Sequence, residues 1–281
     1  MLIDAHVHCW DPTQLSYPWL SGLPVLQRPF LPDALTAPSQ RIRPDGMVFV
    51  QCECLPDQAT AEVAWVSGLA DAGAPVVGIV GYAPMHDTEA TRAVLAAYAT
   101  NPRVCGVRRN IQGEAPGFAC TPAYVASVRL AAAASLTVDL CITHDQLPDI
   151  LRLVDQCAEA VFVLDHCGKP PVASRETSPW AAQLRALAAF PNVSCKLSGL
   201  ATEDGPEWSS SSVAPYLETA LQSFGPGRCM FGSDWPVLTL AGEYAQWYDA
   251  VADALTAYDA PERAEVWSGT ARRTYHIAGL S

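Results

Sequence analysis

Residues 2–8 read LIDAHVH, and the short, largely apolar run at the start of this stretch is typical of a buried strand. Two histidines, His6 and His8, follow at the end of the run. Because residues two apart in a strand point to the same side, both imidazoles are predicted to project together from the C-terminal end of the strand. Such a pair can bind a metal ion or transfer protons, although polar residues at a sheet edge have the same spacing.

The alternation that starts with this strand continues along the whole chain. Strand-like apolar runs are predicted at residues 2–5, 47–52, 76–82, 104–110, 137–142, 161–165, 193–197 and 229–232. Helix-like segments are predicted at 58–71, 88–99, 121–134, 146–157, 179–190, 213–224, 243–255 and 261–276, with N-cap candidates at Asp57, Asp87, Thr121 and Ser178. Eight strands that alternate with helices, without a linker, predict an α/β fold: a single (β/α)8 TIM barrel over residues 1–281. The alternative, an open doubly wound sheet, normally has fewer strands and a glycine-rich turn after the first strand.

One connection departs from the regular alternation. Residues 10–44 form a long stretch that is rich in proline and contains tryptophan and tyrosine. We interpret it as an extended first βα loop with little regular structure. Loops of this length in compact domains are usually functional, so we expect it to form part of a pocket wall.

Composition and charge exclude several classes of function. The chain has a formal net charge of −12 and only 17 Lys and Arg residues, which argues against nucleic acid as a partner, because binding to phosphates requires basic side chains. No run of apolar residues is long enough to span a membrane, and we expect neither a membrane partner nor a targeting segment. The ten cysteines are interpreted as reduced, mostly buried residues, and the expected location is the cytoplasm. The oligomeric state stays open.

Polar side chains follow most of the predicted strands, at the end where a barrel carries its chemistry. His6 and His8 follow the first strand, His166 follows the sixth, and the sequence Ser233-Asp234-Trp235 follows the eighth. We interpret Asp234 as a catalytic base, since a carboxylate at a strand end can take a proton from water. The alternative for Asp234 is a turn or N-cap role.

Several blocks of the sequence resemble one known family. They are IDAHVHCWDP, VFVQCE, GIVGY, GVRRNIQ, FVLDHCGKPP, VSCKLSGL and RCMFGSDWPV, and they run nearly from end to end. They resemble the amidohydrolase superfamily, and within it the sugar-lactonase branch that includes L-fuconolactonase, L-rhamnonolactonase and pyrone dicarboxylate lactonase. The resemblance implies an enzyme that hydrolyses a small sugar-acid lactone to the aldonic acid. Two alternatives stay open: a non-oxidative decarboxylase of the same superfamily, and a barrel that binds a ligand without catalysis.

The resemblance also bears on catalytic and metal-binding residues. His6, His8 and His166 are expected to polarise the lactone carbonyl, either directly or by binding one divalent ion, zinc or manganese, together with Asp234. The binuclear members of the superfamily have a carboxylated lysine or a glutamate on strand 4 and a further histidine on strand 5. Here the fourth strand ends in Arg108-Arg109-Asn110, so we expect at most one metal ion. The resemblance implies that some lactonases of this branch require none.

The remaining candidates are assigned to the substrate, a small sugar lactone. Arg108 and Lys196 offer positive charge and hydrogen-bond donors in an acidic protein, although an ion pair at the barrel rim is the alternative for both. The other expected contacts, with substrate hydroxyls or ring faces, are Gln51, Tyr82, His144, Trp19 and Trp235. His144 could instead start a helix.

Overall fold

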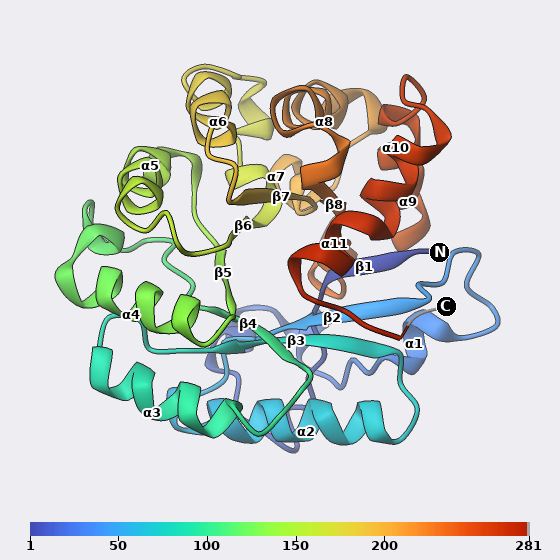
Figure 1. The fold of residues 1–281 in the computed structure, drawn as a ribbon. Helices are drawn as coiled ribbons and strands as arrows, with labels where there is room; N and C mark the ends of the chain where they lie inside the picture. Colours follow the sequence, from blue (N-terminus) through green and yellow to red (C-terminus); the bar gives the residue numbers. More distant parts are fainter. Residues whose placement is uncertain (280–281) are drawn as a thin grey trace.

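A computed structural model describes residues 1–279 and confirms the predicted barrel. Eight parallel strands pair in sequence order, each with the next (Figure 1). They are β1 (Ile3–Val7), β2 (Gly46–Val50), β3 (Val76–Tyr82), β4 (Val104–Arg108), β5 (Thr137–Leu140), β6 (Phe162–Leu164), β7 (Val193–Leu197) and β8 (Cys229–Phe231). Nearly every strand residue is buried, because helices cover the outside and side chains fill the inside. This double burial explains why the strands read as apolar runs.

The barrel closes between β1 and the segment that follows β8. Val7 pairs with Trp235 in a parallel bridge, and the backbone N–H of Asp234 donates to the carbonyl of His6 at 2.9 Å. The buried Asp4 carboxylate accepts hydrogen bonds from the backbone N–H groups of Ser233, at 2.9 Å, and His6, at 3.1 Å. The closure therefore brings the first histidine of the sequence beside the aspartate of the last strand.

Helices surround the sheet (Figure 1). Two of the four predicted N-caps are correct. Asp87 accepts from two backbone N–H groups at the start of its helix, and Thr121 caps the next one. Asp57 was wrong, because it lies inside a 3-10 turn and the helix begins two residues later; Ser178 was wrong, because Pro179 holds the N-cap position. The helices of the outer layer are α2 (Ala59–Asp71), α3 (Thr88–Tyr98), α4 (Pro122–Ala133), α5 (Leu147–Gln156), α6 (Trp180–Ala188), α8 (Ser210–Phe224) and α9 (Tyr244–Ala254).

The long first loop folds against the C-terminal ends of the strands. It contains only short turns and the four-residue helix α1 (Asp33–Thr36), as expected. Trp10 is fully buried and packs edge-to-face against Trp19 and Phe30, with ring centroids 5.3 and 5.4 Å apart. Phe30 in turn packs against Trp235, so an aromatic cluster fixes the loop on the barrel.

The C-terminal segment closes the other end of the barrel. After α10 (Ala260–Ala264), a π-helical turn leads into α11 (Thr270–Thr274), where one helix over 261–276 was predicted. Ala271, Tyr275 and Ile277 pack with inward-facing strand residues in one buried cluster. Residues at the end of the chain thus form the floor of the barrel, beneath the layers that strand side chains fill.

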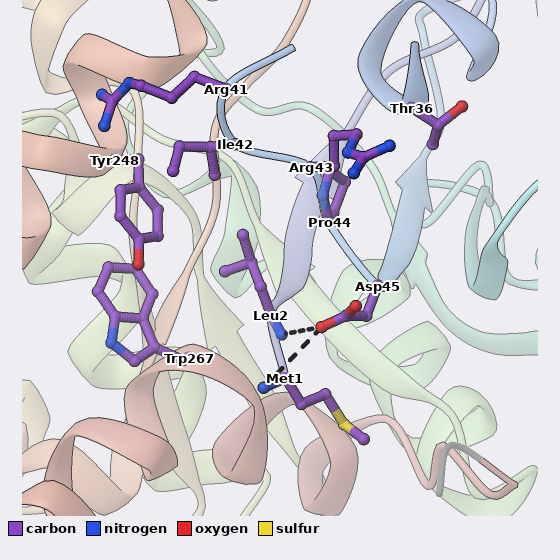
Figure 2. Close-up of a pocket in the computed structure, with 10 residues that line it drawn as sticks. All are labelled: Met1, Leu2, Thr36, Arg41, Ile42, Arg43, Pro44, Asp45, Tyr248 and Trp267. Carbon is purple, nitrogen blue, oxygen red and sulfur yellow. Dashed lines mark hydrogen bonds and ion pairs between the residues drawn. The ribbon is translucent and has the colours of Figure 1, made fainter. Parts of the chain in front are cut away.

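A large cavity lies near the N-terminal ends of the strands, at the start of β1 (Figure 2). It has a volume of about 620 Å³ and is lined by residues around the start of β1 and the end of the first loop, with the stacked rings of Tyr248 and Trp267 on one side. Its wall includes none of the histidines. In the part of the chain that the structure describes, no helix is long and apolar enough to cross a membrane.

A buried carboxylate connects α2 to the end of β2 and leads to a prediction. Glu62 is fully buried and accepts a hydrogen bond from the backbone N–H of Cys52 at 3.2 Å. Burial raises its pKa from 4.5 to about 8. The folded protein therefore keeps a proton that the unfolded chain releases, and this group's contribution to stability is lost as pH rises from about 5 to about 8.

Glu62→Gln should remove this pH dependence, because glutamine keeps the shape and does not ionise. We expect the free energy of unfolding to fall less steeply with pH in the variant than in wild type. Relative to the difference at about pH 5, the variant should gain on the order of 4 kcal/mol over wild type at about pH 8. Urea unfolding at both ends of the pH range measures it. The exposed substitution Glu218→Gln is the matched control, and parallel curves for Glu62→Gln and wild type would contradict the prediction.

Candidate active site

A cavity of about 330 Å³ opens at the C-terminal ends of the strands, where a barrel carries its chemistry. Residues that follow β1, β2, β5, β6 and β8 contribute to its wall, together with the end of β4 and the first loop. The lining residues are His8, Trp19, Cys52, Glu53, Arg108, Asn110, Gln112, Cys141, His166, Lys169, Asp234 and Val237.

The two histidines of β1 meet Asp234 at the inner end of this cavity. The Nε2 atoms of His6 and His8 are 3.2 Å apart, and Asp234 Oδ1 lies 3.6 Å from the first and 3.2 Å from the second. His8 Nδ1 lies 2.8 Å from the carbonyl oxygen of Val50, which makes Nδ1 the donor and leaves Nε2 with a free lone pair. Two ring nitrogens and one carboxylate oxygen therefore face a common point.

His166 comes from the turn after β6 and is held by the segment after β7. Its Nδ1 lies 2.9 Å from the hydroxyl of Ser198. A side chain at Gly199 would bring a Cβ within 2.6 Å of the His166 ring, so only glycine allows this close approach. Its ring centroid is 4.5 Å from that of His6. The block CKLSGL thus holds a catalytic candidate without lining the cavity itself.

A buried ionic layer lies directly beneath His6. Lys196 Nζ contacts Asp139 Oδ2 at 2.6 Å and Asp165 Oδ1 at 2.9 Å. Arg108 donates to Asp165 Oδ2 at 3.0 Å and to the carbonyl of Gln51 at 2.8 Å. Two cations therefore balance two carboxylates, which makes the burial of all four charges tolerable.

The environment sets the protonation states of the central groups. Burial and the nearby Lys196 lower the pKa of His6 well below its ordinary value, and burial lowers the pKa of His166 to about 4. Burial alone would raise the pKa of Asp234, but the facing histidines outweigh it and hold the pKa below the ordinary value. At neutral pH the imidazoles of His6 and His166 are therefore neutral, and Asp234 is ionised and able to accept a proton.

The structure brings together about half of the residues predicted from the sequence. His8, His166, Asp234, Arg108 and Trp19 line the cavity, and His6 lies immediately behind His8 with no exposed surface.

The other five do not line it. Lys196 lies fully buried beneath His6, and Gln51 is buried, with its side chain bonded to Glu53. Tyr82 ends β3, where its carbonyl accepts from Tyr98. Trp235 packs on Phe30. His144 begins a 3-10 turn, the alternative role considered for it, and its Nδ1 lies 3.2 Å from the carbonyl of Lys169.

Seven lining residues were not predicted as site residues, although sequence signals existed for some. Lys169 lies three residues after His166 in the block DHCGKP, and its Nζ is 3.3 Å from a Glu203 carboxylate oxygen. Asn110 and Gln112 belong to the block GVRRNIQ. Cys141 directly follows β5, within the run 137–142 that was predicted as a buried strand. The set is completed by Cys52 and Glu53, which end the block VFVQCE, and by Val237, which ends the block RCMFGSDWPV.

Strained backbone concentrates around the cavity. Among residues 1–279, eight non-glycine residues have a positive φ, and four of them, Glu53, His166, Lys169 and Asp234, line the wall. A left-handed conformation costs about 1 to 3 kcal/mol in a residue with a side chain, and such strain collects at functional sites. It supports the assignment of this cavity, rather than the larger one, as the active site.

The donor atoms fit one divalent ion. His6, His8 and Asp234 form one group of possible ligand atoms, and His166 belongs with His6 and Asp165 in a second. The separations of 3.2 to 3.6 Å in the first group are close to the ~3.3 Å expected between ligand atoms around a tetrahedral zinc ion. The four predicted ligands thus do not form one group of possible ligand atoms in the structure, because His166 is grouped with His6 and Asp165 and not with His8 and Asp234.

The fold and the site define a class of protein: a (β/α)8-barrel enzyme whose histidines and aspartate converge at the ends of β1, β6 and β8. The profile of the amidohydrolase family matches residues 3–277, and the chain belongs to this family of hydrolases.

Similar proteins cover the chain from end to end. The chain is 34% identical to an L-fucono-1,5-lactonase of Burkholderia multivorans, over 98% of this chain and 96% of that protein. It is 32% identical to an L-fucono-1,5-lactonase of Burkholderia ambifaria, over 98% and 95%. A crystal structure of a Burkholderia multivorans amidohydrolase with bound zinc is 33% identical, with a TM-score of 0.88 over 99% of this chain and all of that one.

Proposed function

We propose that the protein hydrolyses a neutral sugar lactone of the L-fucono-1,5-lactone type to the open-chain acid. One observation carries the proposal: a cavity of about 330 Å³, the lower end of the range for small-molecule sites, holds a base, two histidines and several hydrogen-bonding side chains. The names of its relatives support the same reaction.

The charges in the wall favour a neutral substrate. Arg108 is paired with Asp165, and Lys169 is paired with Glu203. The remaining charged groups of the described wall are the carboxylates Glu53 and Asp234. A substrate that carries carboxylate groups would meet no uncommitted cationic side chain in the described wall, whereas hydroxyl groups could bond to paired cations and free carboxylates alike. This argues against a pyrone dicarboxylate and also against the acid that a decarboxylase would need.

The residues supply each step of ester hydrolysis. Asp234 accepts a proton from water as the water oxygen bonds to the lactone carbonyl carbon. Arg108, whose guanidinium lies 3.4 Å from His6 Nε2, and the neutral His166 ring lie where the carbonyl oxygen gains charge. When the ring C–O bond breaks, Asp234 returns the proton to the leaving oxygen, which becomes a hydroxyl group.

His6, His8 and Asp234 would hold one divalent ion, zinc or manganese. When bound, such an ion acidifies water and polarises a carbonyl. Hydrogen-bond partners at Nδ1 orient both rings for this role. His8 Nδ1 is bonded to the carbonyl oxygen of Val50, and His6 Nδ1 lies 3.2 Å from both Lys196 Nζ and Asp165 Oδ1.

Lys169 offers the clearest test of substrate binding. It lines the cavity, and its removal leaves only a partly exposed Glu203 without its partner. Removal of Arg108 would instead leave Lys196 to balance two buried carboxylates, Asp139 and Asp165. Lys169→Met should raise KM roughly tenfold with a smaller change in kcat, because the lost hydrogen bond stabilises ground and transition states alike. Arg175→Met, which removes the nearby Arg175–Asp204 ion pair, is the control and should leave KM unchanged. A fall in kcat at constant KM would contradict the binding role.

A panel of lactones tests the function itself. Acid release, followed with a pH indicator, is expected from neutral sugar 1,5-lactones and not from a pyrone dicarboxylate of similar size. Carbon dioxide release from an unsaturated carboxylic acid would instead support a decarboxylase. The absence of both signals in a folded, metal-supplemented protein would overturn the proposal and favour a binding barrel.

A further inference from the structure

A chain of buried polar groups runs from the floor of the barrel to the catalytic histidines. It begins at Tyr275, directly after α11, which packs among inward-facing strand residues. The Tyr275 hydroxyl donates to Asp139 Oδ2 at 2.7 Å, and Lys196 Nζ donates to the same oxygen at 2.6 Å. Lys196 Nζ then lies 3.2 Å from His6 Nδ1. All four side chains are buried, with at most 1% of their surface exposed.

The chain of contacts fixes one side of the His6 ring. Nδ1 faces Lys196 Nζ and Asp165 Oδ1, both at 3.2 Å, so it has a partner whether it accepts or donates a hydrogen bond. Nε2 is left for His8 and Asp234 at the cavity. A Cβ at Gly232 would come within 2.9 Å of the His6 Cβ, so the backbone directly after β8 also approaches His6 closely. The orientation of His6 therefore depends on where Lys196 Nζ lies, together with Asp165.

Lys196 in turn depends on Asp139. Lysine has a long, flexible side chain, and its ammonium group stays in place only where its partners stay in place. Asp139 is itself held by two hydroxyl groups, Tyr275 on Oδ2 and Thr137 on Oδ1, at 2.7 and 3.2 Å. Thr137 belongs to the same strand, so of these two hydroxyl groups it is that of Tyr275 that connects the carboxylate to a distant part of the chain.

We propose that Tyr275 is a positioning residue for His6, acting through Asp139 and Lys196, so that the C-terminal segment sets the geometry of the active site at the opposite end of the barrel. A floor of the barrel needs only an apolar side chain here, and phenylalanine would fill the same space. The hydroxyl adds a hydrogen bond to an ionic layer that already has balanced charges. Its contribution is therefore to geometry, and buried polar networks are known to specify a unique arrangement in this way.

The test compares two conservative variants. Tyr275→Phe removes the hydroxyl that holds Asp139. Tyr216→Phe, the matched control, removes a buried tyrosine hydroxyl from α8, where it donates to the carbonyl of Glu176 at 3.1 Å, far from the ionic layer. Both variants lose one hydrogen bond, so urea unfolding should detect a similar small loss of stability in both and verify that each is folded.

The readout that separates positioning from stability is the His6 ring itself. In protein with isotope-labelled histidine, the signals of His6 can be identified among those of the six histidines by their absence from a His6→Gln variant. In metal-free protein, Tyr275→Phe should shift the His6 Nδ1 signal, and Tyr216→Phe should leave it unchanged. Unchanged His6 signals in Tyr275→Phe would overturn the proposal.

The kinetic consequence rests on the proposed lactonase function. Tyr275→Phe should lower kcat for a sugar lactone roughly tenfold at nearly constant KM, whereas Tyr216→Phe should match wild type. Equal kinetics of the two variants would overturn the positioning role. A shifted His6 signal in a protein that hydrolyses no lactone would support the positioning role and overturn the proposed function, so the two failures are distinguishable.

Discussion

Asp234→Asn is expected to lower kcat by about three orders of magnitude while the protein stays folded. Asparagine has nearly the same shape and can still contact His8, but it cannot accept the proton of the attacking water. Asp234 is also the ionised carboxylate nearest to both β1 histidines in the described cavity wall, at 3.2 and 3.6 Å. Steady-state rates of acid release from a sugar lactone measure the effect.

Asp204→Asn provides the control for this substitution. Asp204 is a mostly buried carboxylate that pairs with Arg175 outside the cavity, and its replacement should leave kcat within about twofold of wild type. If Asp234→Asn keeps more than about a tenth of wild-type kcat, a loss below ~1.4 kcal/mol, Asp234 is not the base.

Removal of one divalent ion is expected to have an effect of similar size. His8→Ala deletes one of three possible ligand atoms without touching the ionic layer beneath His6. We expect the variant to lose its bound metal and at least ~100-fold in kcat, with no recovery when zinc or manganese is added. Metal content and rate are to be measured on the same samples, before and after chelation.

His86→Ala is the matched control, because His86 packs against Phe118 and belongs to neither group of possible ligands. It should keep both metal and rate. Full activity of wild-type protein after complete removal of metal would contradict the metal site and make the histidines direct hydrogen-bond donors to the carbonyl.

The fold was predictable because its signals are local and strong. Each strand is buried on both faces and therefore reads as an apolar run, and the ends of these runs carry His6, His8, His166 and Asp234. Helix starts were less predictable. Asp87 caps its helix by accepting from two backbone N–H groups, whereas Asp57, an equally good candidate by residue type, lies inside a 3-10 turn.

The depth of a side chain in the barrel could not be predicted from its position at a strand end. Arg108 and Lys196 both come from the C-terminal halves of strands, yet Arg108 reaches the cavity and Lys196 lies beneath His6. The difference depends on Asp139 and Asp165, which neighbouring strands bring together only in the closed barrel. Lys169 was missed because it lies five residues after the end of β6 and reaches the wall only through the left-handed turn at 166–169.

The mass of the product formed in water that contains heavy oxygen tests the central claim most directly. With a neutral sugar 1,5-lactone as substrate, we predict an open-chain acid heavier than the lactone by one labelled water, with the label in the new carboxylate and no carbon dioxide released. The Asp234→Asn protein should form almost none of it. A product lighter than its substrate by carbon dioxide, or labelled product formed equally fast by Asp234→Asn, would contradict a lactonase that uses Asp234 as its base.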